Sequence, residues 1–409
     1  MTIVVHPGDS LRPRQRLVYV LVLGALTALG SFTIDLYLPA FPVIETDFNV
    51  STAIIQLTLT ATTLGFAAGQ LIVGPWSDRV GRRLPLIVAT SIHVAASLGV
   101  AFAPGIEWLF VFRVFQGVGA AAGGVVALAI VRDLFGGLPL VRMLSRLSLV
   151  NGLAPILAPV IGSQLLLLVP WRGIFVVLAG YGAVVLLAAT FLIVETLPVA
   201  RRGDPGHATS RERYRSLFTD RVFVGVSVIQ GLTFAGLFAY LASSSFLFQD
   251  VYGFDPQQYG LLFAANSIGI VAGVQASSFL ARFIGPQWIL AGALSVLLIS
   301  AASIVVLDVT GAGLTGILVP LWFFIAACGF IFPCTQVLAL AGHGGEAGTA
   351  ASLLGALNFG LAGLISPIVG FFGITNAIPM GGVMGCCAFI SLVVLWVVVR
   401  PRTVPALVR

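Results

Sequence analysis

The chain has 409 residues, of which 58% are hydrophobic and only 9% are charged, and its formal net charge at pH 7 is +6. So few charges cannot coat the surfaces of two or three water-soluble domains, which excludes a soluble globular protein and predicts a polytopic membrane protein. The apolar stretches are long enough for membrane-spanning helices and lack the short alternating segments of a membrane β-barrel.

All 21 basic residues are arginine. The absence of lysine excludes a Walker-type phosphate loop and lysine imine chemistry, so we expect neither ATP-driven pumping by this chain nor a Schiff-base cofactor. The four cysteines lie in apolar runs without CxxC spacing, which favours buried small side chains over a metal or redox site. We therefore expect no cofactor and no bound metal.

Cutting the chain at charges, prolines and glycines gives twelve apolar stretches, which predicts an all-α membrane protein with 12 transmembrane helices in two six-helix halves. One long polar segment, 195–221, lies near the middle and is interpreted as a linker between an N-terminal half, 1–194, and a C-terminal half, 222–409. The stretches begin near Leu17, Ser51, Leu84, Glu107, Met143, Trp171, Val222, Gln257, Gln287, Gly313, Gly348 and Asn376.

The arginines predict the orientation of the chain, because loops retained in the cytoplasm accumulate them. With both termini inside, 19 arginines lie on the inner side and only Arg172 lies on the outer side. The remaining one, Arg113, falls within an apolar stretch. We expect a multi-pass protein with both termini in the cytoplasm, and we attribute the net positive charge to membrane orientation rather than to nucleic-acid binding.

An internal repeat near half the chain length predicts two related helix bundles. Three glycines recur at a constant offset of 204, and the segment 159–162 (PVIG) is echoed by 367–370 (PIVG) at an offset of 208. The alternative is that glycine pairs four apart occur wherever membrane helices pack closely. The matched glycines are Gly65, Gly69 and Gly81 with Gly269, Gly273 and Gly285.

Residues 74–83, between the second and third stretches, read GPWSDRVGRR. This spacing resembles the signature loop of the major facilitator superfamily, and the alternative is an ordinary basic loop with a glycine turn. The resemblance implies a gate, in which the acid holds neighbouring helices in one conformation until transport breaks the contact. The second half keeps the turn at 281–286 but has no acid there, so we expect an asymmetric gate. The gating residues implied are Gly74, Asp78, Arg79, Gly81, Arg82 and Arg83.

Arg113 and Gln116 are three residues apart inside an apolar stretch and therefore share a helix face. An arginine in mid-membrane costs about 3 kcal/mol on insertion scales, so it needs a partner or a wet cavity. The segment resembles a superfamily motif associated with proton-coupled members. The candidate partner is Asp35, the only acid that we place within the hydrocarbon, and the two together are predicted to couple proton movement. A structural role for Arg113 and a position of Asp35 near the outer loop remain alternatives.

Pro155, Pro159 and Gly162 lie among small residues in the fifth stretch and predict a bent, closely packed helix. The pattern is similar to a motif of drug/proton antiporters of this superfamily, which favours export. Together with the segments 35–39 (DLYLP), 56–60 and 245–254, it looks like the bicyclomycin and chloramphenicol resistance (Bcr/CflA) branch.

The resemblance implies a monomer in the bacterial cytoplasmic membrane that exports small amphipathic antibiotics, such as amphenicols or bicyclomycin, in exchange for protons by alternating access. The alternative is proton-coupled transport of a physiological metabolite on the same scaffold. An enzyme is not expected, because the sequence has no HExxH, no GxSxG and no usefully spaced Cys/His pair. His93 is expected to be a core residue rather than a proton relay. The substrate cavity is predicted to include Tyr37, Gln116, Phe234, Phe238, Tyr240, Phe332 and Asn358.

Overall fold

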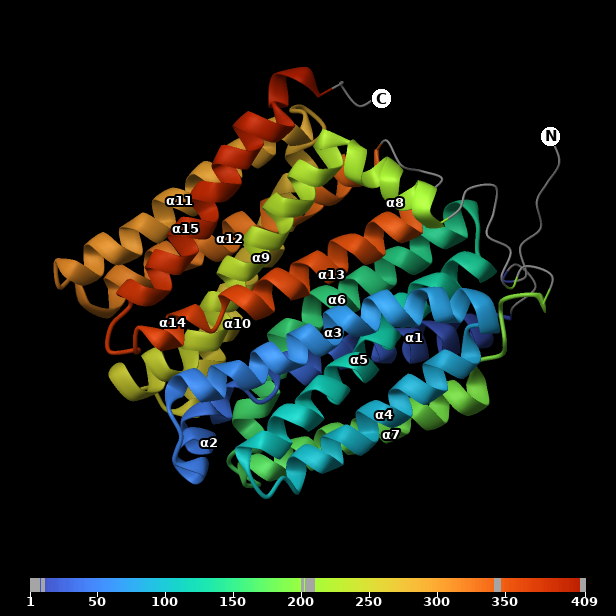
Figure 1. Cartoon of the computed structure of the whole chain (residues 1–409), viewed down its shortest axis with the longest axis horizontal. Coiled ribbons are helices and arrows are strands. Elements are labelled where there is room, and N and C mark those ends of the chain that lie inside the picture. The colour runs from blue at the N-terminus through green and yellow to red at the C-terminus, as the bar shows by residue number, and fades with distance from the viewer. Residues whose placement is uncertain (1–7, 9–11, 200–201, 203–209, 342–346, 405–409) are drawn as a thin grey trace. The chain divides into compact units, whose positions relative to one another are not determined.

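The computed structural model describes residues 8, 12–199, 202, 210–341 and 347–404, and this part of the chain is almost entirely helical (Figure 1). Eleven helical segments in the described ranges are long and apolar enough to cross a membrane, and a twelfth helix contributes the shorter apolar stretch Gly152–Leu165. The predicted all-α class is confirmed. The two ends of the chain and part of the predicted linker over 195–221 lie outside the described residues.

The chain divides into two compact units. Unit 1 consists of Met1–Tyr37 and Ala61–Pro205, and unit 2 consists of Leu38–Thr60 and Gly206–Arg409. The segment Leu38–Thr60 belongs to unit 2 because its own contacts lie there. The amide of Gln56 donates to the carbonyl oxygen of Ala242 at 3.1 Å. The chain therefore passes between the units within the predicted linker and also at both ends of this short segment.

In unit 1, α1 packs against α5, α6 and α7, while α4 packs against α5 and α7. Figure 1 shows α4 and α7 side by side. Apolar side chains from α1, α5 and α7, such as Leu26, Ile130 and Ala189, form the core. The long helices are α1 (Pro13–Asp35), α3 (Thr52–Val80, in this unit from Ala61), α4 (Arg83–Ala101), α5 (Ile106–Leu134), α6 (Gly137–Leu165) and α7 (Trp171–Leu192).

In unit 2, α9 packs against α12, α13 and α15, and α12 also packs against α10 and α11. The long helices are α9 (Arg221–Phe246), α10 (Pro256–Leu280), α11 (Pro286–Val309), α12 (Gly313–Leu340), α13 (Ala347–Ile365) and α15 (Ile378–Val394). The short elements are η2 (Leu38–Ala40), α2 (Phe41–Phe48), α8 (Ser210–Thr219), η4 (Leu247–Val251), α14 (Ile368–Phe371), η6 (Leu395–Val399) and η7 (Pro401–Thr403).

Most of the predicted helix starts lie close to the observed ones, and the largest difference is in α6. This helix begins at Gly137 rather than near Met143, because it includes the charged residue Arg142, whose side chain is exposed. A charge therefore marked the edge of the apolar stretch there and not the end of the helix.

The repeated glycines have the same packing role in the two units. Gly69 of α3 lies against the backbone of Val118 in α5, and a Cβ atom at Gly69 would come within 2.7 Å of that carbonyl oxygen. Gly273 of α10 lies in the same way against the carbonyl of Ala326 in α12. Only glycine permits this close approach of the two backbones.

Candidate functional site

The signature segment 74–83 is mostly helical. The helix α3 continues through Pro75 to Val80, so the turn before α4 consists only of Gly81 and Arg82. A proline removes one helix hydrogen bond, which the surrounding turns tolerate here, and the hydroxyl of Ser77 donates to the carbonyl of Gly74 at 2.8 Å. Gly81 has φ +107°, a backbone conformation that favours glycine.

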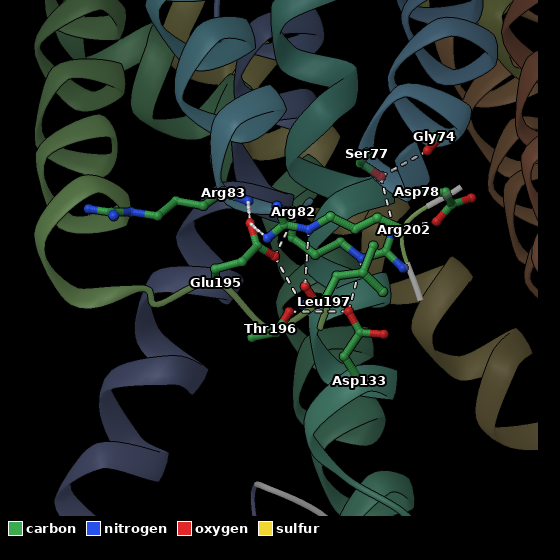
Figure 2. A network of polar contacts seen from close by, with 10 residues as sticks. All are labelled: Gly74, Ser77, Asp78, Arg82, Arg83, Asp133, Glu195, Thr196, Leu197 and Arg202. Carbon is green, nitrogen blue, oxygen red and sulfur yellow. Dashed lines mark hydrogen bonds and ion pairs between the residues drawn. The ribbon is translucent and has the colours of Figure 1, made fainter. Parts of the chain in front are cut away.

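Arg82 connects three helices in this region (Figure 2). Its Nε donates to Asp133 Oδ2 at 2.9 Å, its Nη1 donates to Ser77 Oγ at 3.0 Å, and Nη1 also pairs with Asp78. Burial lowers the pKa of Arg82, but the bonds to Asp133 and Asp78 outweigh it, so the pKa is raised above its ordinary value. The guanidinium therefore stays charged and joins the ends of α3 and α5 to the start of α4.

Glu195, which the sequence interpretation did not single out, caps the start of α4. Its carboxylate accepts hydrogen bonds from the backbone N–H groups of Arg82 at 2.9 Å, Arg83 at 3.2 Å and Leu197 at 2.9 Å, and it pairs with Arg202 at 3.9 Å. Burial acts to raise the pKa of Glu195, but these N–H groups and the Arg202 charge lower it overall. The carboxylate occupies space that a side chain at residue 81 would fill, so Gly81 and Glu195 fit each other.

We call Ser77, Asp78, Arg82, Asp133 and Glu195 the Arg82 cluster. Of the other predicted gating residues, Gly74 lies beside it as the acceptor for Ser77. Arg83 extends away from it (Figure 2), donating to the carbonyl of Thr190 in α7 at 2.5 Å. Arg79 is exposed. Asp78, expected to be the central acid, has a side chain 66% exposed, whereas that of Asp133 is 14% exposed. The more shielded acid of the cluster is therefore one that the motif does not contain.

Arg113 is completely buried in unit 1. Its Nη1 donates to the carbonyl of Thr33 at 3.0 Å and to Gln116 Oε1 at 2.6 Å, while its guanidinium carbon lies 4.0 Å from the centre of the Tyr37 ring. The Nε and Nη2 atoms have no hydrogen-bond partner among the described residues. Sequence reasoning thus placed Arg113 and Gln116 on one face correctly, and Tyr37 lies with them.

Asp35 is the last residue of α1, and only 5% of it is exposed. Its Oδ1 has no hydrogen-bond partner among the described residues. The direct Asp35–Arg113 ion pair considered from the sequence is not formed in the described structure, because a backbone carbonyl, an amide and an aromatic ring surround the guanidinium instead. The link between the two residues is Thr33, which lies in the same turn of α1 as Asp35 and accepts from Arg113.

The contacts of Arg113 belong to a larger buried polar network. The amide of Gln116 donates to Ser97 Oγ at 2.8 Å, and the Ser97 hydroxyl donates to the carbonyl of His93 at 2.7 Å. His93 Nε2 lies 2.9 Å from Thr33 Oγ1, which closes a ring of contacts through α1, α4 and α5. We call Thr33, His93, Ser97, Arg113 and Gln116 the buried polar network.

Gly162 of α6 lies directly against the carbonyl of Leu36, the residue after Asp35, and a Cβ atom there would collide with that carbonyl. Glycine is therefore required at position 162 for the close approach of α6 to the end of α1. Pro155 and Pro159 lie in the two preceding turns of the same helix. The segment that resembles the antiporter motif thus contacts the turn that contains the buried acid.

Four phenylalanines in unit 2 form an aromatic cluster, consisting of Phe234, Phe238, Phe332 and Phe359 from α9, α12 and α13. The Phe234 ring centre lies 4.8, 6.0 and 5.1 Å from those of Phe238, Phe332 and Phe359 respectively. Beside Phe359 in the chain, Asn358 has a buried Oδ1 without a hydrogen-bond partner among the described residues. Phe359 was missed, although its position next to Asn358 in an apolar stretch was a usable signal.

The remaining predicted cavity residues lie elsewhere. Tyr240 stacks on Phe263 at 5.6 Å and its hydroxyl accepts from the Asn266 amide at 3.0 Å, so it faces α10. Tyr37 and Gln116 belong to unit 1. Three of the seven predicted residues therefore meet in the aromatic cluster, with Asn358 next in sequence to its fourth ring. Within the described ranges, no group of three or more His, Cys, Asp or Glu side chains is arranged to hold a metal ion.

Two helical units of long apolar helices, of which unit 1 buries charged side chains and contains the basic signature turn, define a multi-pass membrane transporter. The sequence model of the Major Facilitator Superfamily matches residues 21–367. The chain belongs to this superfamily of secondary transporters and is not an enzyme.

Several bacterial proteins are similar to the chain over nearly its whole length. The uncharacterized MFS-type transporter YdgK of Bacillus subtilis is 36% identical, covering 95% of this chain and 97% of that protein. The bicyclomycin resistance protein homolog of Haemophilus influenzae is 28% identical, with 92% and 94% covered. The multidrug resistance protein MdtL of Klebsiella pneumoniae is 30% identical, with 94% and 96% covered.

Solved structures agree on the fold. The crystal structure of a D-xylose-proton symporter matches with a TM-score of 0.75 at 16% identity, covering 96% of this chain and all of that one. At this identity the similarity shows the major facilitator fold and nothing about substrate.

Proposed function

We propose that the chain is a drug/proton antiporter that exports small amphipathic antibiotics, such as amphenicols or bicyclomycin, in exchange for protons. The observation that carries the proposal is the position of Asp35. It is the one buried acidic side chain among the described residues, its Oδ1 is unpartnered, and the chain leaves unit 1 two residues later. An ionised carboxylate is costly to keep away from water, whereas a protonated one is much less so. Proton binding at Asp35 is therefore linked to whether water reaches the end of α1.

In the proposed cycle, Asp35 binds a proton when it is open to one side and releases it when it is open to the other. Arg113 supplies a fixed positive charge nearby without pairing with Asp35, so the acid remains able to exchange its proton. Because the chain enters unit 2 at Leu38, a change in the turn at Asp35 acts directly on a connection between the units. Gly162 keeps α6 against that turn.

The substrate class is supported by two further observations. The bicyclomycin resistance protein homolog and the multidrug resistance protein MdtL are 28% and 30% identical to the chain. The aromatic cluster offers ring faces for a flat apolar group, and Asn358 Oδ1 offers an acceptor for a donor on the substrate. An apolar surface with one polar anchor suits small amphipathic molecules.

We further propose that the protein acts as a monomer in the bacterial cytoplasmic membrane with both termini in the cytoplasm. The arginine distribution, 19 against 1, supports this orientation. The Arg82 cluster then lies on the cytoplasmic side and acts as a gate. Labelling of a cysteine introduced in the linker should succeed only with reagents that reach the cytoplasm, and labelling from outside intact cells would contradict the orientation.

The test uses the full-length protein in proteoliposomes with a pH indicator, chloramphenicol and bicyclomycin as probes. The wild type should release protons on drug binding and exchange drug for protons. Asp35→Asn should keep drug binding and lose both proton signals, because the amide mimics the protonated acid. Glu107→Gln, which neutralises an exposed acid in α5, is the matched control and should behave as the wild type.

Normal exchange by Asp35→Asn would show that the coupling group lies elsewhere. If metabolites from a panel drive proton exchange and neither antibiotic does, the substrate is a physiological metabolite and not a drug.

A further inference from the structure

The hydrogen bonds of Thr33 determine which nitrogen of His93 carries the proton. Thr33 Oγ1 lies 2.6 Å from the carbonyl oxygen of Leu29 and 2.9 Å from His93 Nε2. A carbonyl can only accept, so the single hydroxyl proton of Thr33 goes to Leu29. The contact with His93 is then a hydrogen bond only if Nε2 carries a proton and donates to the hydroxyl oxygen. His93 is therefore a donor to Thr33.

The other ring nitrogen is an acceptor without a donor. Nδ1 of His93 is buried and has no hydrogen-bond partner among the described residues. It faces Gly182 of α7, where an added Cβ atom would lie 3.0 Å from it. Only one of the two imidazole nitrogens is thus engaged, and it is the one that reaches α1.

Thr33 uses two separate groups to connect neighbouring helices. Its hydroxyl accepts from His93 of α4, while its backbone carbonyl accepts from Arg113 of α5. The same residue stands two positions before Asp35, in the last turn of α1. A displacement of the Thr33 side chain therefore moves both the Thr33 carbonyl, which accepts from Arg113, and the turn of α1 that ends in Asp35.

We propose that His93 is a positioning residue for proton coupling: its Nε2–H holds Thr33, and through Thr33 it fixes Arg113 relative to Asp35. This rests on the proposed function and deepens it. Without the donor, α1 loses its side-chain link to α4, and the carbonyl of Thr33 is no longer held in place for Arg113. The guanidinium, whose Nε and Nη2 are unpartnered, is then able to change its acceptors.

The charged and titratable groups around this turn are few. Arg113 comes from α5, His93 from α4, and Tyr37 follows Asp35 in the chain. On α7, Tyr181 donates to the carbonyl of Ala25 at 2.7 Å. The helix α6 brings Arg142 and Arg146 only near its start, where both are exposed. A change in the titration of Asp35 caused at His93 would therefore be transmitted through Arg113 and not through another carboxylate of these helices.

Two pairs of substitutions separate the hydrogen bond from other effects. His93→Gln can place an amide N–H where Nε2 lies, whereas His93→Leu removes the donor. Thr33→Ser keeps the hydroxyl, whereas Thr33→Val removes it and leaves the backbone carbonyl. The thermal unfolding midpoint of each variant checks the fold, and Thr33→Val continues the test if His93→Leu does not fold.

The first readout needs no substrate. In infrared spectra of the full-length protein in lipid, the carboxyl band lost in Asp35→Asn reports protonation of Asp35 as pH is varied. His93→Leu and Thr33→Val should move the midpoint of this band by about one pH unit, while His93→Gln and Thr33→Ser should leave it in place. In proteoliposomes with chloramphenicol, the first two should lower turnover about tenfold with little change in KM. The double variant should be no worse than either single one, because both remove the same bond.

The outcomes distinguish the positioning role of His93 from the proposed antiport function. An Asp35 band that titrates but is unmoved by His93→Leu and Thr33→Val overturns the positioning role and leaves the proposed function intact. If His93→Gln is as defective as His93→Leu, a hydrogen-bond donor at this position is not what the protein needs from His93, and the positioning role is wrong. If no Asp35 band titrates, the proposed function fails and this inference fails with it.

Discussion

The two units repeat the same helix packing but bury different chemistry. In unit 1, α5 carries the buried Arg113, which holds together a network of polar side chains. At the repeat offset of 204, the corresponding residue of α12 in unit 2 is Ile317, which is also fully buried. The buried polar side chains described in unit 2 are amides and hydroxyls, as in the 2.9 Å bond from Thr335 to Gln230, and four phenylalanines form the aromatic cluster.

The turns that follow α3 and α10, the two helices that contain the repeated glycines, also differ in their charged groups. Gly81 has φ +107° and lies against Glu195 in the Arg82 cluster, whereas Gly285 has an ordinary φ of −60°. Near Gly285, the exposed rings of Phe279 and Phe283 contact each other at 5.3 Å. The repeat therefore preserves backbone packing, while the buried charged side chains of the described residues lie in unit 1. Coupling and gating are expected to be properties of unit 1, and recognition of apolar groups a property of unit 2.

The largest effect is expected from Arg113→Ala compared with Ile317→Ala. Both truncations should lower the free energy of unfolding by about 2–3 kcal/mol, the first by leaving buried acceptors unpaired and the second by opening a cavity. Only Arg113→Ala should also reduce drug-dependent proton exchange, to less than about 1% of the wild type, because it removes the buried charge near Asp35. Thermal unfolding and proteoliposome exchange measure the two effects. Equal losses of exchange in both variants would show that the units share the coupling task.

The two glycines of the turns provide the next test. Gly81→Ala forces a side chain into a left-handed backbone, at about 1–2 kcal/mol, and pushes against the Glu195 carboxylate. In Gly285→Ala the new Cβ atom meets only the end of the flexible Gln287 side chain, so stability should change by less than about 1 kcal/mol. Turnover should fall severalfold in the first variant alone, with drug affinity retained. Similar behaviour of the two variants would remove the asymmetry that we infer for the gate.

Local features of the molecule could be predicted from sequence because they depend on neighbouring residues. The helix starting at Trp171 and the pairing of Arg113 with Gln116 follow from the edge of an apolar stretch and from spacing on one helix face. The start of α6 was placed too late because the charge of Arg142 was taken as the edge of the helix, although its exposed side chain is compatible with a helix that begins at Gly137.

Contacts between distant residues could not be predicted in the same way. Glu195 caps α4 from 112 residues away, and His93 meets Thr33 across 60 residues. Neither pairing leaves a local pattern, since each depends on how the helices pack. The considered Asp35–Arg113 pair illustrates the same limit: opposite charges in one apolar region suggested a bond, but a backbone carbonyl, which every residue carries, accepts from the guanidinium instead.

A smaller effect is expected in the aromatic cluster. Phe234→Leu keeps apolar volume but removes the ring at the centre of the cluster, whereas Phe263→Leu removes a ring that stacks on Tyr240 outside it. Loss of ring stacking with a bound aromatic drug should raise KM for chloramphenicol about 3- to 10-fold in the first variant and leave it nearly unchanged in the second. Drug-dependent proton stoichiometry should stay the same in both. A change in stoichiometry would show that coupling extends into unit 2.

The smallest effect concerns pH and the cap at the start of α4. Because the pKa of Glu195 is lowered in the folded protein, its carboxylate contributes stability above the unfolded pKa, and that contribution is lost only as pH falls through the folded value. Thermal stability should thus be insensitive to this group between about pH 7 and 5 and should decline below about pH 4. Glu195→Gln should be slightly less stable at pH 7 and should show a smaller decline in acid, since an amide does not titrate. At the repeat offset of 204 this position in unit 2 is Val399, which is buried and apolar, so Val399→Ala should leave the acid decline as in the wild type. If the stability of Glu195→Gln declines in acid as much as that of the wild type, other carboxylates cause the decline. Glu195 would then not be the pH-dependent contact that distinguishes the two turns.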